Sequence, residues 1–281
     1  MSAIRRAGAP LALLALLAAA GCPRPHPRPV EVFKSPDALV AAASAAAGKV
    51  VTLVGDMKVD SFDRKGGVKG KVKADASFIL RRPDELRIDV FDLGGVPLVS
   101  AVTSPGGFAL YDMGAKTYYY GPPSPCSMEV LLALPFGPAE LVQVMLGAPP
   151  LLEGGTHSLR YNGKTGEYEL KIARGEEKQE CFFEATGPRL RACTLTRGDK
   201  VVSRLSYESW EEVEGLPGVR LPRRLYYEQP VESSDVLIKI KKVWVDKDLD
   251  PETFVLAAPT GVATVPVCAP EPPPETFVPG G

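Results

Sequence analysis

The chain has 281 residues, of which 45% are hydrophobic and 24% charged, the composition of an ordinary globular protein with an apolar core. Its formal net charge of −1 argues against a nucleic-acid partner, because such proteins gain affinity by neutralising phosphates with excess Lys and Arg. With two histidines and no Cys-x-x-Cys spacing, we expect neither a metal site nor a cofactor.

The N-terminus has the pattern of a secretory signal peptide. Arg5 and Arg6 form a positive start, and the apolar stretch 7–20 that follows is too short to span a membrane. Residues 17–22 read Leu-Ala-Ala-Ala-Gly-Cys, which resembles a bacterial lipobox. The resemblance implies a signal peptide at 1–21, with cleavage before a cysteine that becomes acylated. An ordinary signal peptide followed by an incidental cysteine is the alternative.

The acylated cysteine would be Cys22, and it would anchor the protein to a membrane. In the linker that follows, 22–35, every second residue from Pro23 to Pro29 is proline. Such a sequence favours a semi-rigid polyproline II spacer. Pro23 stands where lipoproteins retained in the inner membrane commonly carry Asp. We therefore expect a lipid-anchored protein of the outer membrane whose domain faces the periplasm.

A short helix is predicted at the start of the folded domain, which we place at 36–260. Ser35 can cap the helix and Pro36 suits its first turn. The Ala-rich run 37–47 then continues to Gly48, where the helix is expected to end.

Beyond residue 48, apolar and polar side chains alternate with a period of two, which is typical of antiparallel strands with one buried face. The alternation is strict in residues 85–90, Glu-Leu-Arg-Ile-Asp-Val. Gly-rich turns separate the runs, so the pattern predicts a meander of roughly ten to thirteen strands. The runs lie near 49–61, 68–80, 85–90, 97–103, 107–120, 168–172, 178–185, 189–197, 200–210, 219–229 and 236–241.

Two apolar helices interrupt this pattern. Residues 127–134 have helical character, and a second helix, 139–146, starts after Pro138 and ends at Gly147. Helices this apolar must be buried on the apolar face of the sheet. The predicted architecture is a curved sheet with helices on its concave side.

The five cysteines form two pairs once Cys22 is lipidated. Cys181 and Cys193 flank a predicted turn symmetrically, so hairpin strands would place them opposite each other. Cys126 and Cys268 then pair by elimination. The tail, 261–281, is rich in proline and is expected to be disordered.

Three segments together resemble LolB, the family of outer-membrane lipoprotein receptors, and more loosely the periplasmic carrier LolA. They are the lipobox with the helix and strand that follow it, residues 82–98 with Arg-Pro-Asp-Glu-Leu-Arg-Ile and Asp-Leu-Gly-Gly-Val-Pro-Leu, and residues 141–149 with Leu-Gly-Ala-Pro. The resemblance extends over roughly 37–260. It implies a mainly β (α+β) fold, an unclosed antiparallel half-barrel of about eleven strands with helices over a hydrophobic concave face.

The resemblance also implies a function. A LolB-like half-barrel binds the acyl chains of lipoproteins handed over by a soluble LolA-like carrier, and releases them into the outer membrane. The proline-rich tail and the extra cysteines depart from the family and leave the cargo open. Candidate cavity residues, for each of which simple core packing is the alternative, are Leu86, Ile88, Val90, Leu131, Leu132, Leu141, Val142, Met145 and Leu146.

One apolar residue stands where a turn is predicted. Leu93 precedes Gly94 and Gly95, and the resemblance implies a protruding loop whose exposed leucine helps deliver cargo to the membrane. The alternative is that Leu93 folds back onto the core.

We expect a monomeric, membrane-anchored lipoprotein that binds lipoprotein acyl chains or another lipid and is not an enzyme. The sequence contains no Gly-x-Ser-x-Gly, phosphate-loop, His-Glu-x-x-His or EF-hand pattern. A structural or adaptor lipoprotein with a filled core and no cargo is the alternative. A hydrolase whose site the sequence does not reveal is the third possibility.

Overall fold

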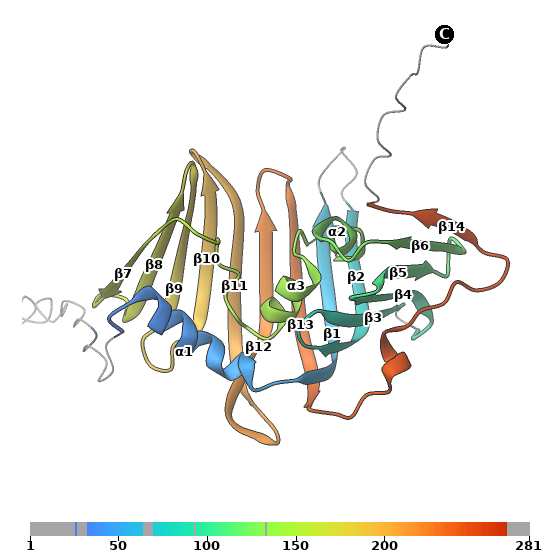
Figure 1. The fold of residues 1–281 in the computed structure, drawn as a ribbon, viewed down its shortest axis with the longest axis horizontal. Helices are drawn as coiled ribbons and strands as arrows, with labels where there is room; N and C mark the ends of the chain where they lie inside the picture. The colour runs from blue at the N-terminus through green and yellow to red at the C-terminus, as the bar shows by residue number, and fades with distance from the viewer. Residues whose placement is uncertain (1–25, 27–32, 64–69, 93, 133, 269–281) are drawn as a thin grey trace, which may run out of the picture.

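Most of the described chain belongs to one large sheet with helices packed on it (Figure 1). The computed structural model describes residues 26, 33–63, 70–92, 94–132 and 134–268. The helices are α1 (Pro36–Gly48), α2 (Pro125–Leu132), α3 (Pro138–Met145) and the short 3-10 helix η2 (Pro251–Phe254). The strands are β1 (Thr52–Asp63), β2 (Gly70–Arg81), β3 (Glu85–Phe91), β4 (Pro97–Ser104), β5 (Gly107–Asp112), β6 (Thr117–Gly121), β7 (Thr156–Asn162), β8 (Glu167–Arg174), β9 (Glu177–Glu184), β10 (Leu190–Arg197), β11 (Lys200–Val213), β12 (Leu216–Gln229), β13 (Ser234–Val245) and β14 (Ala263–Pro266).

The fourteen strands follow the order β14-β6-β5-β4-β3-β2-β1-β13-β12-β11-β10-β9-β8-β7 across the sheet. All neighbours pair antiparallel except β14, which runs parallel to β6. Because β14 and β7 are edges that do not pair with each other, the sheet does not close. The predicted mainly β fold, an unclosed antiparallel sheet with helices, is confirmed.

The sheet has three strands beyond the eleven predicted runs. The run at 107–120 divides into β5 and β6, because a turn separates the two strands. Strand β7 was not predicted, since most of its side chains are exposed and only a weak apolar alternation remains. Strand β14 lies in the tail that was expected to be disordered.

Helices α2 and α3 belong to the connection between β6, near one edge of the sheet, and β7, at the other edge. We call residues 122–155 the crossover segment. Because a chain joining opposite edges must cross a face of the sheet, its apolar side chains are buried against the inward-facing positions of the strands. Figure 1 shows α2 and α3 in front of the central strands, with α1 running across the strands nearer β7.

One apolar core fills the space between the sheet and these helices. Along β3, Leu86 and Ile88 are buried while Arg87 between them is not, as the strict alternation predicted. Leu39 of α1 and Leu141 of α3 belong to the same core. Each fully buried side chain of this kind stabilises the fold by about 1.5–3 kcal/mol.

The residues that predicted where the helices begin and end have these roles in the structure. The Ser35 hydroxyl accepts a hydrogen bond of 3.2 Å from the Ala38 amide at the start of α1. After α3, Gly147 adopts a φ of +82°, and a Cβ at this position would collide with the Trp210 ring. Only glycine satisfies both conditions, so α3 ends here.

The chain beyond β13, residues 246–268, wraps the outer face of the sheet, and we call it the C-terminal strap. The Asp246 carboxylate accepts a hydrogen bond of 2.9 Å from the Val51 amide. Phe254 of η2 is buried beneath the Arg81 guanidinium, 4.9 Å from the ring centroid. The strap then adds β14 beside β6.

The prediction of a disordered tail from residue 261 is therefore wrong for residues 263–268. Parallel pairing with the free edge of β6 supplies backbone hydrogen bonds that composition alone does not reveal, and Val267 donates a further one of 2.8 Å to the Tyr120 carbonyl. Cys268 is covalently fixed to Cys126. The rest of the tail, 269–281, lies outside the described residues.

Several predictions concern residues that the structure does not describe. The expected signal peptide, Cys22, the proline linker apart from His26 and residues 33–35, and Leu93 all lie outside the described residues. In the part of the chain that is described, no helix is long and apolar enough to span a bilayer.

Candidate functional site

An open pocket of about 420 Å³ lies between the crossover segment and the inner face of β9–β12. Its volume is within the range of small-molecule pockets, roughly 300–1,000 Å³. The crossover segment contributes Pro135, Phe136, Glu140, Pro150, Leu151, Leu152 and Glu153. The sheet contributes Arg174, Gln179, Cys193, Leu195, Val202, Ser203, Leu205, Tyr227 and Gln229.

The rear part of the crossover segment, residues 144–152, is fixed to the sheet by buried hydrogen bonds. The Tyr207 hydroxyl of β11 donates to the Val144 carbonyl at 2.9 Å. The Gln179 side chain of β9 donates to the Pro150 carbonyl and accepts from the Leu152 amide, both at 2.7 Å. Burial raises the pKa of the Tyr207 hydroxyl well above its ordinary value, so this donor keeps its proton. This wall of the pocket is rigidly placed.

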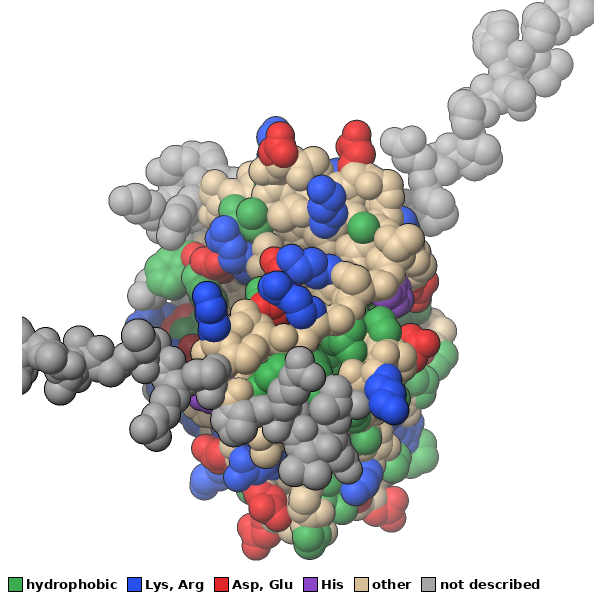
Figure 2. Space-filling model, turned by 90° about the vertical axis from the view of Figure 1, so that its left-hand side faces the viewer, with side chains coloured by type: hydrophobic (Ala, Val, Ile, Leu, Met, Phe, Trp, Pro, Cys, Tyr) green, Lys and Arg blue, Asp and Glu red, His purple; other side chains and the backbone are tan. Residues whose placement is uncertain are grey.

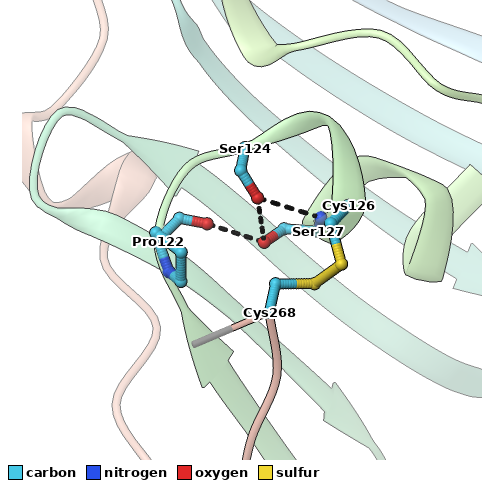
Figure 3. Close-up of a disulfide and its surroundings, with 5 residues drawn as sticks. All are labelled: Pro122, Ser124, Cys126, Ser127 and Cys268. Atoms are coloured by element: carbon cyan, nitrogen blue, oxygen red, sulfur yellow. Dashed lines mark hydrogen bonds between the residues drawn. A yellow bond between two sulfur atoms is a disulfide. The ribbon is translucent and has the colours of Figure 1, made fainter. Parts of the chain in front are cut away.

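The front part of the crossover segment, which consists of α2 and residues 134–136, is held in place by different contacts. The Phe136 ring packs edge-to-face on Tyr227 of β12, with the ring centroids 5.0 Å apart. Helix α2, just before Phe136, is tied to the C-terminal strap through the Cys126–Cys268 disulfide (Figure 3). Apolar packing and one covalent bond therefore hold this part of the wall.

The electrostatics of the pocket favour neutral groups inside and charged groups at its rim. Burial raises the pKa of Tyr227 to about 12, so its phenol is neutral. Desolvation at the pocket wall raises the pKa of Glu140, and the nearby charge of Glu153 adds to the shift. The rim cation, Arg174, is already paired with Glu177 at 2.7 Å. A ligand with an apolar body and a polar end matches this distribution.

A second cavity, of about 470 Å³, lies on the outer side of β7–β10. Its lining is mostly Thr, Ser, Lys and Glu, and it includes the ion pair between Lys171 and Glu180. Figure 2, which views the molecule from the β7 side, shows charges of both signs interspersed over this surface. This outer cavity differs from the inner pocket in its position, because it lies among charged and hydroxyl-bearing side chains of the sheet and not between the sheet and the crossover segment.

The nine predicted cavity residues are brought together by the structure, but in the core. Leu86, Ile88, Leu132, Leu141, Val142, Met145 and Leu146 are buried members of one apolar cluster, and Val90 and Leu131 are partly buried against it. None of the nine is among the residues that line the inner pocket. Their part in a lipid-binding cavity stays a prediction.

The residues that do line the pocket were missed at the level of sequence. They include Leu195 and Val202, which are only half-buried, and Leu152, which follows α3. The alternation along 189–197 marks Leu195 as inward-facing. It does not show that the crossover segment leaves this part of the sheet uncovered.

The turn between β3 and β4 contains the predicted delivery loop. Leu93 lies outside the described residues, but its neighbours Val96 and Leu98 are 57% and 39% exposed. The Asp92 carboxylate accepts hydrogen bonds of 2.8 Å from the Gly94 and Val96 amides and fixes the shape of the turn. Two large apolar side chains are therefore presented to solvent at this end of the sheet.

Both disulfides expected from the sequence are present. Cys181 and Cys193 occupy directly opposed positions of β9 and β10. Cys126, the second residue of α2, joins Cys268 at the end of the C-terminal strap. The first bridge links strands that already pair, whereas the second links elements that are far apart in sequence.

Groups suited to metal binding do not gather anywhere in the described residues: no set of three or more His, Cys, Asp or Glu could hold an ion. His157, at the β7 edge, has its Nε2 3.3 Å from the Gly154 carbonyl.

None of the protein-family models matches this sequence, and neither does any curated protein. Among solved structures, a DUF1329 family protein from Desulfovibrio piger is similar, with a TM-score of 0.54 and 12% identity over 78% of this chain and 96% of that one. A LolA superfamily protein from Nitrosomonas europaea has a TM-score of 0.49 at 7% identity, covering 78% and 97%. A putative outer membrane lipoprotein-sorting protein domain from Vibrio parahaemolyticus has the same score and identity, covering 77% and 95%. At such identities the likeness concerns the fold alone.

Proposed function

We propose that this protein is a lipoprotein, anchored through Cys22, that binds acyl chains of lipoproteins or other lipids in the inner pocket and delivers them to the outer membrane. The observation that carries the proposal is the pocket itself, an opening of about 420 Å³ beside the apolar core of an unclosed half-barrel. The LolB-like sequence segments support the same function. In this proposal the protein has no catalytic role.

The chemistry of the pocket suits this cargo. Each methylene group moved from water into an apolar site contributes about 0.8 kcal/mol, so an acyl chain needs a matching surface rather than a reactive group. Phe136, Leu205 and Tyr227 provide such a surface, and the charged groups at the rim can remain hydrated next to a polar head group. Transfer to the membrane then requires only that the bilayer offers a comparable apolar environment.

The pocket adjoins the predicted cavity residues. In this proposal a longer chain reaches Leu141, Val142 and Met145 when the crossover segment moves away from the sheet. The donor would be a soluble LolA-like carrier, and the exposed turn around Leu93 would make the contact with the bilayer.

One specific observation favours a second function. The apolar side chains of α3, Leu141, Val142, Val144 and Met145, are almost completely buried in the core without a ligand. A structural or adaptor lipoprotein, docked on an envelope complex and carrying no lipid, would have this property. The pocket would then be a surface recess.

Substitution at two adjacent positions of β10 tests the pocket. Leu195 lines the inner pocket, while its neighbour Thr194 lies on the outer side of the same strand, and both are half-buried. We expect Leu195→Glu to weaken binding of a dansyl-labelled fatty acid by about tenfold or more, because a buried carboxylate costs more than the 1.4 kcal/mol that this factor represents. Thr194→Glu is the matched control and should bind like the wild type.

Mass spectrometry separates the two functions. The chain with Cys22 deleted, purified from cells without detergent, should release lipid upon solvent extraction if the pocket carries cargo. A sample without lipid, combined with no fatty-acid binding in solution, would favour the adaptor.

A further inference from the structure

The two disulfides differ sharply in their accessibility. Cys181 and Cys193 are 1% and 4% exposed and lie against the core. Cys126 is exposed and Cys268 half-buried. Since thiol–disulfide exchange requires access of a thiolate to a sulfur atom, a reductant reaches the Cys126–Cys268 bridge first.

The accessible bridge holds a small and locally weak structure. Helix α2 has eight residues, too few to be stable by itself in water. Around it, the Ser127 hydroxyl donates to the Pro122 carbonyl at 2.6 Å, and the Ser124 hydroxyl lies 3.2 Å from that of Ser127 (Figure 3). These bonds are within the segment itself and do not tie it to the sheet.

On the other side of the bridge, Cys268 lies two residues beyond β14, a strand of four residues. All side chains of β14 are exposed, and the strand pairs with β6 alone. The disulfide therefore joins the chain just beyond the outermost strand of the sheet to the first turn of α2.

The pocket wall is thus fixed unequally along its length. The rear part is bonded to β9 and β11 through Gln179 and Tyr207, whose partners are backbone groups. The front part, α2 with Phe136, is held by apolar contacts of Met128 and Leu132 and by the disulfide. Loss of the covalent tie would loosen the front part while the rear part stays in place.

We propose that the Cys126–Cys268 disulfide is a redox latch on the inner pocket. While the disulfide is intact, α2 and Phe136 stay in place and close the passage from the pocket into the core. Reduction of the disulfide lets α2 and Phe136 move, so that an acyl chain can enter the core. The proposal rests on the proposed lipid-binding function. The reductant is a dithiol. One of its thiolates attacks a sulfur of the bridge and releases the other as a thiolate, and its second thiol then resolves the mixed disulfide. Two electrons pass to the protein, which ends with two thiols, and the dithiol becomes a disulfide.

The test compares the oxidised chain with the same chain after mild treatment with dithiothreitol, with alkylation and peptide mapping to verify that only Cys126 and Cys268 have become thiols. The probe is a dansyl-labelled fatty acid. We expect its dissociation constant to fall at least about threefold upon reduction, because a larger fraction of molecules is open. Reoxidation should restore the original value.

The double variant Cys126→Ser with Cys268→Ser should bind like the reduced protein, and mild treatment of this variant with dithiothreitol is the control that should change its binding no further. Hydrogen exchange gives a readout that needs no lipid: upon reduction the amides of α2 should exchange faster, while those of residues 144–152 should not. Unchanged exchange in α2 overturns the latch.

The binding data distinguish the two proposals. Binding that is equal in both redox states refutes the latch and leaves the proposed function standing. Absence of binding in both states refutes the latch together with the lipid-binding function. Because reduction and reoxidation use the wild-type chain, a variant that fails to fold does not affect these conclusions.

Discussion

The hydroxyl group of Tyr207 is the best-defined polar contact between the sheet and the crossover segment. It is buried, donates to the Val144 carbonyl at 2.9 Å, and lies 3.3 Å from the Ala148 carbonyl. Tyr207→Phe removes only this hydroxyl, because the ring and its edge-to-face contact with Trp210, at 5.7 Å between centroids, remain.

The magnitude of the effect follows from the acceptors left behind. A buried polar group that loses its partner costs about 1–3 kcal/mol. The Val144 carbonyl also accepts a hydrogen bond of 3.0 Å from the Gly147 amide, so the loss is partial and the lower half of this range, about 1–2 kcal/mol, is expected. In a domain of this size 1 kcal/mol corresponds to about 2–4 °C, which predicts a Tm lower by roughly 2–8 °C.

Urea and thermal unfolding, followed by circular dichroism, measure this loss. Tyr226→Phe is the matched control, because Tyr226 is half-buried and its hydroxyl donates to the Glu228 side chain instead of a buried carbonyl. We expect the control to remain within about 0.5 kcal/mol of the wild type. If Tyr207→Phe unfolds at the wild-type temperature, or if both variants lose equal stability, the hydroxyl does not fix the pocket wall.

Three further predictions concern acid stability, the anchor and the delivery loop. The hydrogen bond from Arg160 lowers the pKa of the Glu169 carboxyl, so the stabilisation is present above the ordinary value of 4.5 and is lost as the pH falls below it. Arg160→Gln should therefore unfold at a lower urea concentration than the wild type at pH 7, the difference should shrink as the pH falls below 4.5, and equal curves at pH 7 would contradict this. Cys22→Ala should leave an uncleaved precursor that takes up no labelled palmitate, whereas continued labelling would exclude acylation at this residue. Leu93→Glu should slow delivery of lipid to liposomes with folding and lipid binding unchanged; an unfolded variant would place Leu93 in the core, and unimpaired delivery would exclude the loop from transfer.

The sequence by itself determined the class of fold, because the signals that specify it are local. The alternation of apolar and charged residues in 85–90 shows directly which side chains of β3 face the core. The start of α1 is set by Ser35 and Pro36, and the two ends of α3 are set by Pro138 and Gly147. Both effects depend on capping and backbone geometry that involve only near neighbours in the sequence. The Cys181–Cys193 pairing was also accessible from the sequence, since the turn between them fixes the register.

Only the tertiary structure decided where the pocket lies. Leu195 and Ile88 are both inward-facing strand residues, but the crossover segment covers Ile88 and leaves Leu195 at an open pocket. The path of a segment that joins opposite edges of a sheet depends on which distant strands become those edges. The same holds for β14, whose pairing with β6 depends on a free edge more than a hundred residues away in sequence. Local periodicity contains no information on these long-range contacts, because they form only when distant strands and helices pack together around one core.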